Sequence, residues 1–178
     1  MKFKKFKFKR VESTNNTAIK VIKKTDCTFG MIIAESQSKG KGRYGRKWIS
    51  FKGNIFVSFF NELNKSNLSI DAITKINCNL VKKLLSKFTS KKILFKKPND
   101  LLIDKKKISG ILQEIILIKN KKFLITGIGI NIIKNPNIKN YPATNLHEIT
   151  KKSISKLKVE KKLKQIFEKN FSKLYKLK

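Results

Sequence analysis

A glycine-rich, strongly basic segment between two apolar runs constrains this chain more than any other feature. It spans residues 34–48, and the runs 31–34 and 55–60 on either side have the composition of buried strands. Backbone without Cβ atoms can approach a ligand closely, its N–H groups can surround an anion, and neighbouring cations supply opposite charge. The segment therefore predicts a phosphate-holding loop between two strands. Its glycines and cations are Gly40, Gly42, Gly45, Lys39, Lys41, Arg43, Arg46 and Lys47.

Neither common nucleotide-binding fingerprint explains this segment. A Walker loop requires Ser or Thr directly after Gly-Lys, and neither residue follows at that spacing. Residues 40–45 satisfy Gly-x-Gly-x-x-Gly, but that fingerprint has to open a helix, whereas a charged stretch and a new strand follow here. From the residues alone, a flexible basic loop without a ligand remains the alternative.

The net charge of +32, from 43 Lys+Arg against 11 Asp+Glu, is typical of proteins that bind nucleic acid or an anionic membrane. Arginine occurs only at Arg10, Arg43 and Arg46, so nearly all of the excess is lysine. The chain is also rich in Ile, Asn and Phe, the mixture expected from an A/T-biased genome, and such a bias explains the lysine excess at least as well as nucleic-acid binding does. Two of the three arginines lie in the glycine segment, where a planar guanidinium suits phosphate.

The length of 178 residues is enough for one domain with its own core. Cys27 and Cys78 lack metal-ligand spacing, so we expect free core thiols in a reducing cytoplasm and no protein metal site. The first ten residues alternate Phe and Lys, unlike the apolar core of a signal peptide. No apolar run approaches the length of a membrane span, so a soluble protein without membrane contact is expected.

The apolar periodicity predicts an α+β fold with a mixed, largely antiparallel sheet and several helices. A helix should begin at Ser13 or Thr14, whose side chain caps it, and longer helices should cover 71–88 and 155–175. The apolar face expected of the last helix consists of Leu157, Leu163, Ile166, Phe167, Phe171 and Leu174.

Strands are expected on both sides of the 71–88 helix, with polar residues 61–69 as a connection before it. Pro98, Asn99 and Asp100 read as a turn, and a tight charged hairpin should follow. Pro136 and Pro142 mark a loop near the end of the sheet. The strands are predicted at 6–9 (a half-buried edge strand), 31–34, 55–60, 93–95 running into 96–103, 108–114 and 123–132, with the hairpin turn at 104–107.

The glycine segment resembles the ligand loop of biotin protein ligases, which reads Gln-x-x-Gly-Arg-Gly-Arg-x-Gly-Arg-x-Trp. Gln37 and Trp48 bracket it here, and Lys41 stands where Arg is most frequent. Further family motifs appear in the same order, so the resemblance covers residues 10–150. They are residues 12–15 (Asp/Glu-Ser-Thr-Asn), 96–100 (Lys-Trp-Pro-Asn-Asp, with Lys97 in place of Trp), 107–114 (Lys-hydrophobic-Ala/Ser/Gly-Gly-Ile-Leu-x-Glu), 127–131 (Gly-hydrophobic-Gly-hydrophobic-Asn) and 143–146 (similar to Ala-Thr-Ser-Leu).

The resemblance implies the fold shared by class II aminoacyl-tRNA synthetases and by biotin and lipoate ligases. It also implies the reaction: biotin and ATP, with Mg²⁺, give biotinyl-5′-AMP, and biotin then passes to one lysine of a biotin carboxyl carrier domain of a carboxylase. We expect residues 1–178 to form a single catalytic domain, without an N-terminal helix-turn-helix or a small SH3-like C-terminal barrel. No specific nucleic-acid partner is expected, and the resemblance leaves a homodimer open.

The resemblance also assigns roles. Lys107 should contact the biotin carboxylate and the α-phosphate, Arg43 should close over the intermediate, and Asp100 should orient and deprotonate the incoming lysine. Asn131 should contact the adenine, while His147 is expected to be a surface residue. The full set of expected ligand-binding residues is Ser13, Thr14, Asn15, Gln37, Gly40, Lys41, Gly42, Arg43, Trp48, Asn99, Lys107, Gly110 and Asn131.

Two other functions fit parts of the sequence. A lipoate or octanoate ligase shares the expected fold and chemistry but should lack this glycine loop. A non-catalytic basic protein that binds nucleic acid fits the charge, and it predicts steep salt dependence and no use of ATP.

Overall fold

The computed structural model describes residues 2–63 and 68–175, and for 171–175 it describes the backbone only. One seven-stranded sheet in the order β1-β2-β3-β7-β6-β5-β4 organises this part of the chain. β1 and β2 are parallel and every other neighbouring pair is antiparallel, which confirms the predicted mixed, largely antiparallel sheet. The strands are β1 (Lys4–Val11), β2 (Phe29–Gln37), β3 (Ile55–Glu62), β4 (Ile93–Lys96), β5 (Asp100–Ile103), β6 (Lys106–Ile118) and β7 (Lys121–Ile130).

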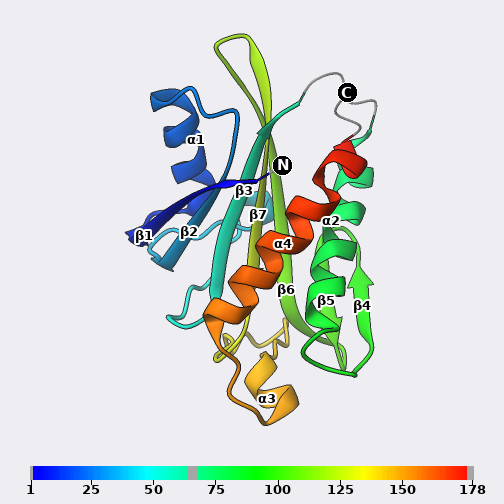
Figure 1. Cartoon of the computed structure of the whole chain (residues 1–178). Coiled ribbons are helices and arrows are strands. Elements are labelled where there is room, and N and C mark those ends of the chain that lie inside the picture. The colour runs from blue at the N-terminus through cyan, green and yellow to red at the C-terminus, as the bar shows by residue number, and fades with distance from the viewer. Residues whose placement is uncertain (1, 64–67, 176–178) are drawn as a thin grey trace.

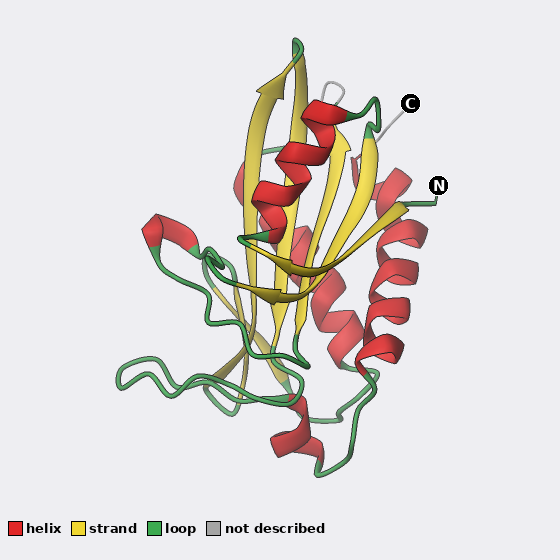
Figure 2. Ribbon diagram, turned by 90° about the vertical axis from the view of Figure 1, so that its left-hand side faces the viewer, coloured by secondary structure: helices red, strands yellow, loops and turns green. Residues whose placement is uncertain are grey.

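Helices cover both faces of the sheet. One helix, α1, lies on one face, and the two long helices α2 and α4 pack side by side on the other (Figures 1 and 2). The loops that follow β2 and β7 lie at the lower end in Figure 2, together with the short helix α3, whereas the turn between β6 and β7 lies at the upper end. The helices are α1 (Thr14–Lys24), α2 (Ile70–Leu85), α3 (Leu146–Thr150) and α4 (Lys156–Tyr175), and a 3₁₀ turn covers Arg43–Gly45.

The period-two alternation of the strands builds two separate apolar layers. In β2, Met31 and Ile33 join the core under α2 and α4, while Ile32 between them joins the core under α1. In β3, Phe59 and Phe60 divide in the same way. Both faces of these central strands are therefore buried, as their continuous apolar runs predict.

The expected elements are found, with two corrections. Ser13 occupies the cap position of α1, but its side chain makes no capping hydrogen bond, so the predicted side-chain cap was wrong. Leu157, assigned to the buried face of the last helix, is 68% exposed, because α4 packs through Val159 and the buried residues one and two turns further on. Phe171 and Leu174 lie outside the described side chains, and the expected polar connection at 61–69 lies partly outside the described residues.

The predicted edge strand and charged hairpin are confirmed. β1 is an outer strand of the sheet, with Phe6 and Phe8 half-buried between exposed lysines. The turn between β5 and β6 consists of Asp104 and Lys105, both with positive φ (49° and 60°), as a two-residue hairpin turn requires. Cys27 is half-buried and Cys78 fully buried, and both are free thiols. Across residues 2–63 and 68–175, no helix is both long and apolar enough to cross a bilayer.

We expect Phe167→Ala to lower the free energy of unfolding by about 3–5 kcal/mol. The Phe167 ring stacks on Phe59 of β3 with centroids 4.2 Å apart and planes within 3°, so its removal leaves a cavity between α4 and the sheet. Urea unfolding followed by circular dichroism measures the change. The matched control is Leu157→Ala on the same helix, which should change stability by less than about 0.5 kcal/mol. Equal losses in the two variants would contradict this packing.

Candidate active site

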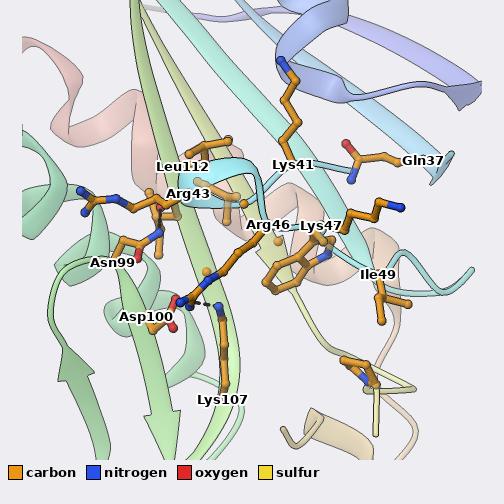
Figure 3. A pocket seen from close by; sticks show the side chains of 18 of the residues that line it. Gln37, Lys41, Arg43, Arg46, Lys47, Ile49, Asn99, Asp100, Lys107 and Leu112 are labelled. Atoms are coloured by element: carbon orange, nitrogen blue, oxygen red, sulfur yellow. Dashed lines mark hydrogen bonds and ion pairs between the residues drawn. The ribbon is translucent and has the colours of Figure 1, made fainter. Parts of the chain in front are cut away.

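A cavity of about 580 Å³ opens on the α1 face of the sheet, where the glycine segment meets the loop that follows β7 (Figure 3). That volume suits a small organic ligand. Every site residue predicted from the sequence lines this cavity except Gly40. The lining residues are Ser13, Thr14, Asn15, Gln37, Lys41, Gly42, Arg43, Arg46, Lys47, Trp48, Ile49, Asn99, Asp100, Lys107, Gly110, Ile111, Leu112, Gly127, Ile128, Gly129, Asn131, Pro136, Ile138, Tyr141 and Ala143.

Three glycines make the floor of the cavity. Gly127 and Gly129 lie two residues apart on β7, so they share the α1 face, and Gly110 of β6 pairs directly with Gly129. Further along the same face of β7, Phe123 and Ile125 fill the space under α1. The change from large residues to glycine along one strand face is what leaves room for a ligand here.

Side chains from elsewhere approach this bare floor closely. A Cβ on Gly129 would lie 2.5 Å from Cε2 of Trp48, and one on Gly110 would lie 2.9 Å from Cζ3 of the same ring. A Cβ on Gly127 would collide with the Asn15 side-chain oxygen. The Trp48 Nε1 donor is buried and has no hydrogen-bond partner among the described residues, so it is free to donate to a ligand.

A polar network occupies the end of the cavity next to the start of α1. The Gln37 Oε1 accepts from the backbone N–H of Thr14 at 2.8 Å, and Gln37 Nε2 donates to Ser50. The Ser58 hydroxyl lies 2.8 Å from the hydroxyl of Thr14 and donates to Oδ1 of Asn15 at 2.5 Å. The side chains of a helix start and two strands are thereby held in one orientation.

Glu114 of β6 extends this network to the glycine segment. Asn15 Nδ2 donates to one carboxylate oxygen at 2.6 Å, and Lys41 Nζ lies 3.9 Å from the other. Lys41 also donates to Oδ1 of Asn16 at 2.6 Å. In Figure 3 its side chain accordingly points toward α1 and away from Lys107.

The strongest electrostatic contact in the cavity is the ion pair of Lys107 and Asp100, with 2.7 Å between Nζ and Oδ1. Asp100 begins β5 and is 4% exposed, so its charge needs a partner. The Lys107 ammonium lies 5.3 Å from the Trp48 ring and 5.5 Å from the Tyr141 ring. Two aromatic faces thus restrict a side chain that is otherwise flexible.

The glycine segment folds back on itself as a small hairpin over the cavity. The N–H of Trp48 donates to the carbonyl of Gly40 at 2.9 Å, and the N–H of Gly42 donates to Arg46 at 2.7 Å. Gly40 packs against the Trp48 carbonyl, 2.5 Å from where its Cβ would stand, and so shapes the hairpin rather than the cavity wall. Lys39 bonds Glu12 at 2.9 Å, and this hydrogen bond and charge lower the pKa of the Glu12 carboxyl.

The two arginines of the hairpin point in different directions. Arg43, the predicted catalytic arginine, bonds the hydroxyl of Tyr44 at 3.0 Å and stacks on its ring. Arg46 instead reaches toward Asp100 and Lys107 (Figure 3). The sequence reading did not assign Arg46 to the site, although the glycine motif contains it.

The side chains of two predicted binding residues, Asn99 and Asn131, form hydrogen bonds to backbone carbonyls of neighbouring segments. Asn99 donates from Nδ2 to the carbonyl of Ile111 at 2.6 Å, which fixes the turn between β4 and β5 against β6. Asn131 donates from Nδ2 to the carbonyl of Thr144 at 3.1 Å and is 2% exposed. Lys97, which stands in place of the family tryptophan, is exposed and does not line the cavity.

Sequence reasoning missed Tyr141, Ser58 and Asn54. Tyr141 lies in a loop without any motif, so nothing in the sequence pointed to it. Ser58 interrupts an otherwise apolar strand run, and that interruption was an available signal. Asn54 is fully buried, and its Oδ1 accepts the N–H groups of Ile132 and Ile133 just after β7.

The described residues offer no set of three or more His, Cys, Asp and Glu side chains able to hold a metal ion. Asp100 is the one carboxylate among the residues that line the cavity. Burial, with a smaller contribution from Asp100, raises the pKa of the Cys78 thiol to about 12, so Cys78 is not a nucleophile at neutral pH. His147 is exposed on α3, as expected.

Known proteins resemble this chain in sequence and in structure. A model of the biotin/lipoate A/B protein ligase family matches residues 7–131. The chain belongs to this family. A biotin protein ligase from Aquifex aeolicus, solved in complex with biotin and ATP, has a TM-score of 0.81 and 31% identity over 97% of this chain and 72% of that one. The biotin-ligase-like fold implied by the sequence motifs is thereby confirmed.

Two curated relatives are bifunctional ligase/repressors. BirA of Escherichia coli strain K12 is 33% identical over 102 residues, which are 56% of this chain and 32% of the relative. BirA of Bacillus subtilis strain 168 is 27% identical over 169 residues, which are 90% of this chain and 51% of the relative. The chain spans about half the length of these family members, or less.

We expect Gly129→Ala to displace Trp48 and to lower the free energy of unfolding by about 1–3 kcal/mol, because a methyl group would overlap the indole ring. Trp48 is the only tryptophan of the chain, so its fluorescence reports its own surroundings. Emission should shift to longer wavelength as the ring becomes hydrated. Lys122→Ala, at the exposed far end of β7, serves as the control and should keep the original spectrum. An unchanged spectrum in Gly129→Ala would show that the ring does not lie on this floor.

Proposed function

We propose that this chain is a biotin–protein ligase, which activates biotin with ATP and transfers it to one lysine of a biotin carboxyl carrier domain. The observation that carries the proposal is the convergence of three chemistries on one cavity. A fixed polar network, a cationic glycine hairpin and the Lys107–Asp100 pair all line it. Family membership supports the same reaction, and the matched Aquifex aeolicus enzyme was solved with biotin and ATP.

The polar network suits the bicyclic ring of biotin. A ureido group needs both donors and acceptors in fixed positions, and Thr14, Asn15 and Gln37 supply hydroxyl and amide groups in one hydrogen-bonded set. The apolar part of the ring needs apolar contacts, and Ile111, Leu112 and Ile128 in the lining supply them. Ser13 lies beside this set and is also buried.

The first half-reaction brings the biotin carboxylate to the α-phosphate of ATP, and two anions have to meet. Cations held in place before the reaction lower that barrier, since they need no reorganisation as charge develops. Lys107 and Arg46 both line the cavity, and Arg46 reaches toward Lys107 (Figure 3). Lys107 can exchange Asp100 for the phosphate. Arg43 and Lys41, on the hairpin, close over the product biotinyl-5′-AMP while pyrophosphate leaves.

The second half-reaction needs a neutral amine, and a free lysine is protonated at neutral pH. Asp100 accepts the proton of the incoming ammonium once Lys107 has turned to the phosphate. The amine then attacks the mixed anhydride, an amide bond forms, the bond between the acyl carbon and the phosphate oxygen breaks, and AMP leaves. The hairpin excludes water, which would otherwise hydrolyse the intermediate.

Mg²⁺ would be bound by the ATP phosphates, whose negative charge it would offset, and not by a site of the protein itself. The described residues do not present the carboxylates of a resident metal site, because the one carboxylate lining the cavity is paired with Lys107. We place the reaction in the cytoplasm, which the two free thiols support. The carrier domain is the proposed macromolecular partner, and a homodimer stays open.

The direct test is incubation of the purified chain with biotin, Mg-ATP and a biotin carboxyl carrier domain, followed by mass spectrometry of that domain. We expect the carrier to gain one biotinyl group on one lysine. A parallel reaction with lipoate and a lipoyl carrier domain tests the nearest alternative. A lipoyl adduct without a biotinyl adduct would establish that alternative instead, and steep salt-dependent duplex binding without either adduct would favour the nucleic-acid reading.

We expect Lys107→Ala to reduce biotin-dependent pyrophosphate release by about 10²–10³-fold, because it removes a cation aimed at the developing phosphate charge. Lys106→Ala is the matched control, since Lys106 is the neighbouring residue and makes only a surface ion pair with Glu148 at 3.6 Å. Circular dichroism shows whether both variants fold. Pyrophosphate release at the unmodified rate in Lys107→Ala would remove its assigned role.

A further inference from the structure

Tyr141 has no role in the reaction described above, yet its side chain lies among the charged groups of the cavity. Its hydroxyl lies 3.3 Å from Oδ2 of Asp100 and donates to it. The Lys107 ammonium is 5.5 Å from the centre of its ring, the Lys96 ammonium 5.2 Å and the Arg46 guanidinium 5.8 Å. Three cations from the hairpin, β4 and β6 thus surround one aromatic ring, a favourable arrangement for cation–π contacts.

The backbone holds Tyr141 in register with Lys107. The N–H of Lys107 donates to the carbonyl of Pro142 at 2.8 Å, and the N–H of Thr144 donates to the carbonyl of Lys107 at 2.9 Å. Asn131 holds the same loop through the Thr144 carbonyl. The loop that carries Tyr141 is therefore attached to the start of β6 directly after this residue.

We propose that Tyr141 is a positioning residue that aligns Asp100 and Lys107 with each other, an inference that rests on the proposed ligase function. The two oxygens of Asp100 have different partners, since Lys107 takes Oδ1 and the Tyr141 hydroxyl takes Oδ2. When Lys107 leaves Asp100 for the phosphate, the hydroxyl is the contact that still fixes the carboxylate. Asp100 then faces the incoming amine in one orientation.

The ring of Tyr141 acts on Lys107 rather than on Asp100. The Lys107 ammonium lies over both the Trp48 ring and the Tyr141 ring, at 5.3 Å and 5.5 Å from their centres. Removal of one ring would let the lysine stem leave its place, and small displacements of a catalytic group lower rates strongly. The hydroxyl and the ring therefore serve different half-reactions, and separate substitutions distinguish them.

The half-reactions are assayed separately. Biotin-dependent pyrophosphate release without a carrier domain reports adenylation, and purified biotinyl-5′-AMP with the carrier domain, without ATP, reports transfer. Tyr141→Phe removes only the hydroxyl, and we expect about a tenfold slower transfer, the loss typical of a hydrogen bond to a charged group, with adenylation within about twofold. Tyr141→Leu also removes the ring, and we expect both half-reactions to slow by about tenfold or more.

Lys139→Ala, an exposed residue on the same loop, is the control and should leave both rates unchanged. Equal effects of Tyr141→Phe on the two half-reactions, or no effect on transfer, would overturn the proposal, because a residue that only packs is served equally well by Phe. The Phe variant keeps the inference testable even where the Leu variant does not fold. If the unmodified chain releases no pyrophosphate with biotin, the proposed function itself fails, and this inference with it.

Discussion

The absence of side chains at three adjacent sheet positions is the constraint on which this site depends. Gly110, Gly127 and Gly129 interrupt a face that α1 otherwise covers with large apolar residues, and the cavity lies where that cover stops. The Trp48 ring, the Lys107 side chain and the Asn15 amide pack directly against these glycines. A Cβ at any of the three would displace a neighbour before any ligand was met. The residues that line the cavity are therefore arranged around a stretch of sheet that has no side chains of its own.

The charged centre is held by mutual pairing rather than by deep burial alone. A buried carboxylate without a partner would either take up a proton or destabilise the fold. The Lys107 ammonium pairs with Asp100 and so prevents both outcomes. The same ion pair holds the Lys107 ammonium in the cavity and away from solvent. Around it, backbone bonds from Pro142 and Thr144 lock the start of β6 to the loop after β7. Segments far apart in the sequence thus fix one pair of charges.

Most of the fold and the composition of the site were predictable, for identifiable reasons. Period-two and helical patterns marked the strands and long helices, and the ordered motifs singled out residues that the structure brings around one cavity. Directions of side chains were not predictable: Arg43 and Arg46 share one motif, yet they point apart because the Arg43–Gly45 turn separates them. Tyr141 escaped notice because its side-chain contacts with Asp100 and Lys107 depend on the pairing of Lys107 with Ala143, which no local pattern encodes.

The lysines of β1 have a consequence unrelated to the cavity. This strand borders the sheet, so its outer N–H and C=O groups face solvent and could template a strand from another molecule. Exposed cations such as Lys4, Lys7 and Lys9 repel an identical edge from a second copy. We expect this repulsion to disfavour edge-to-edge pairing of β1 between two copies, which gives part of the lysine excess a structural purpose.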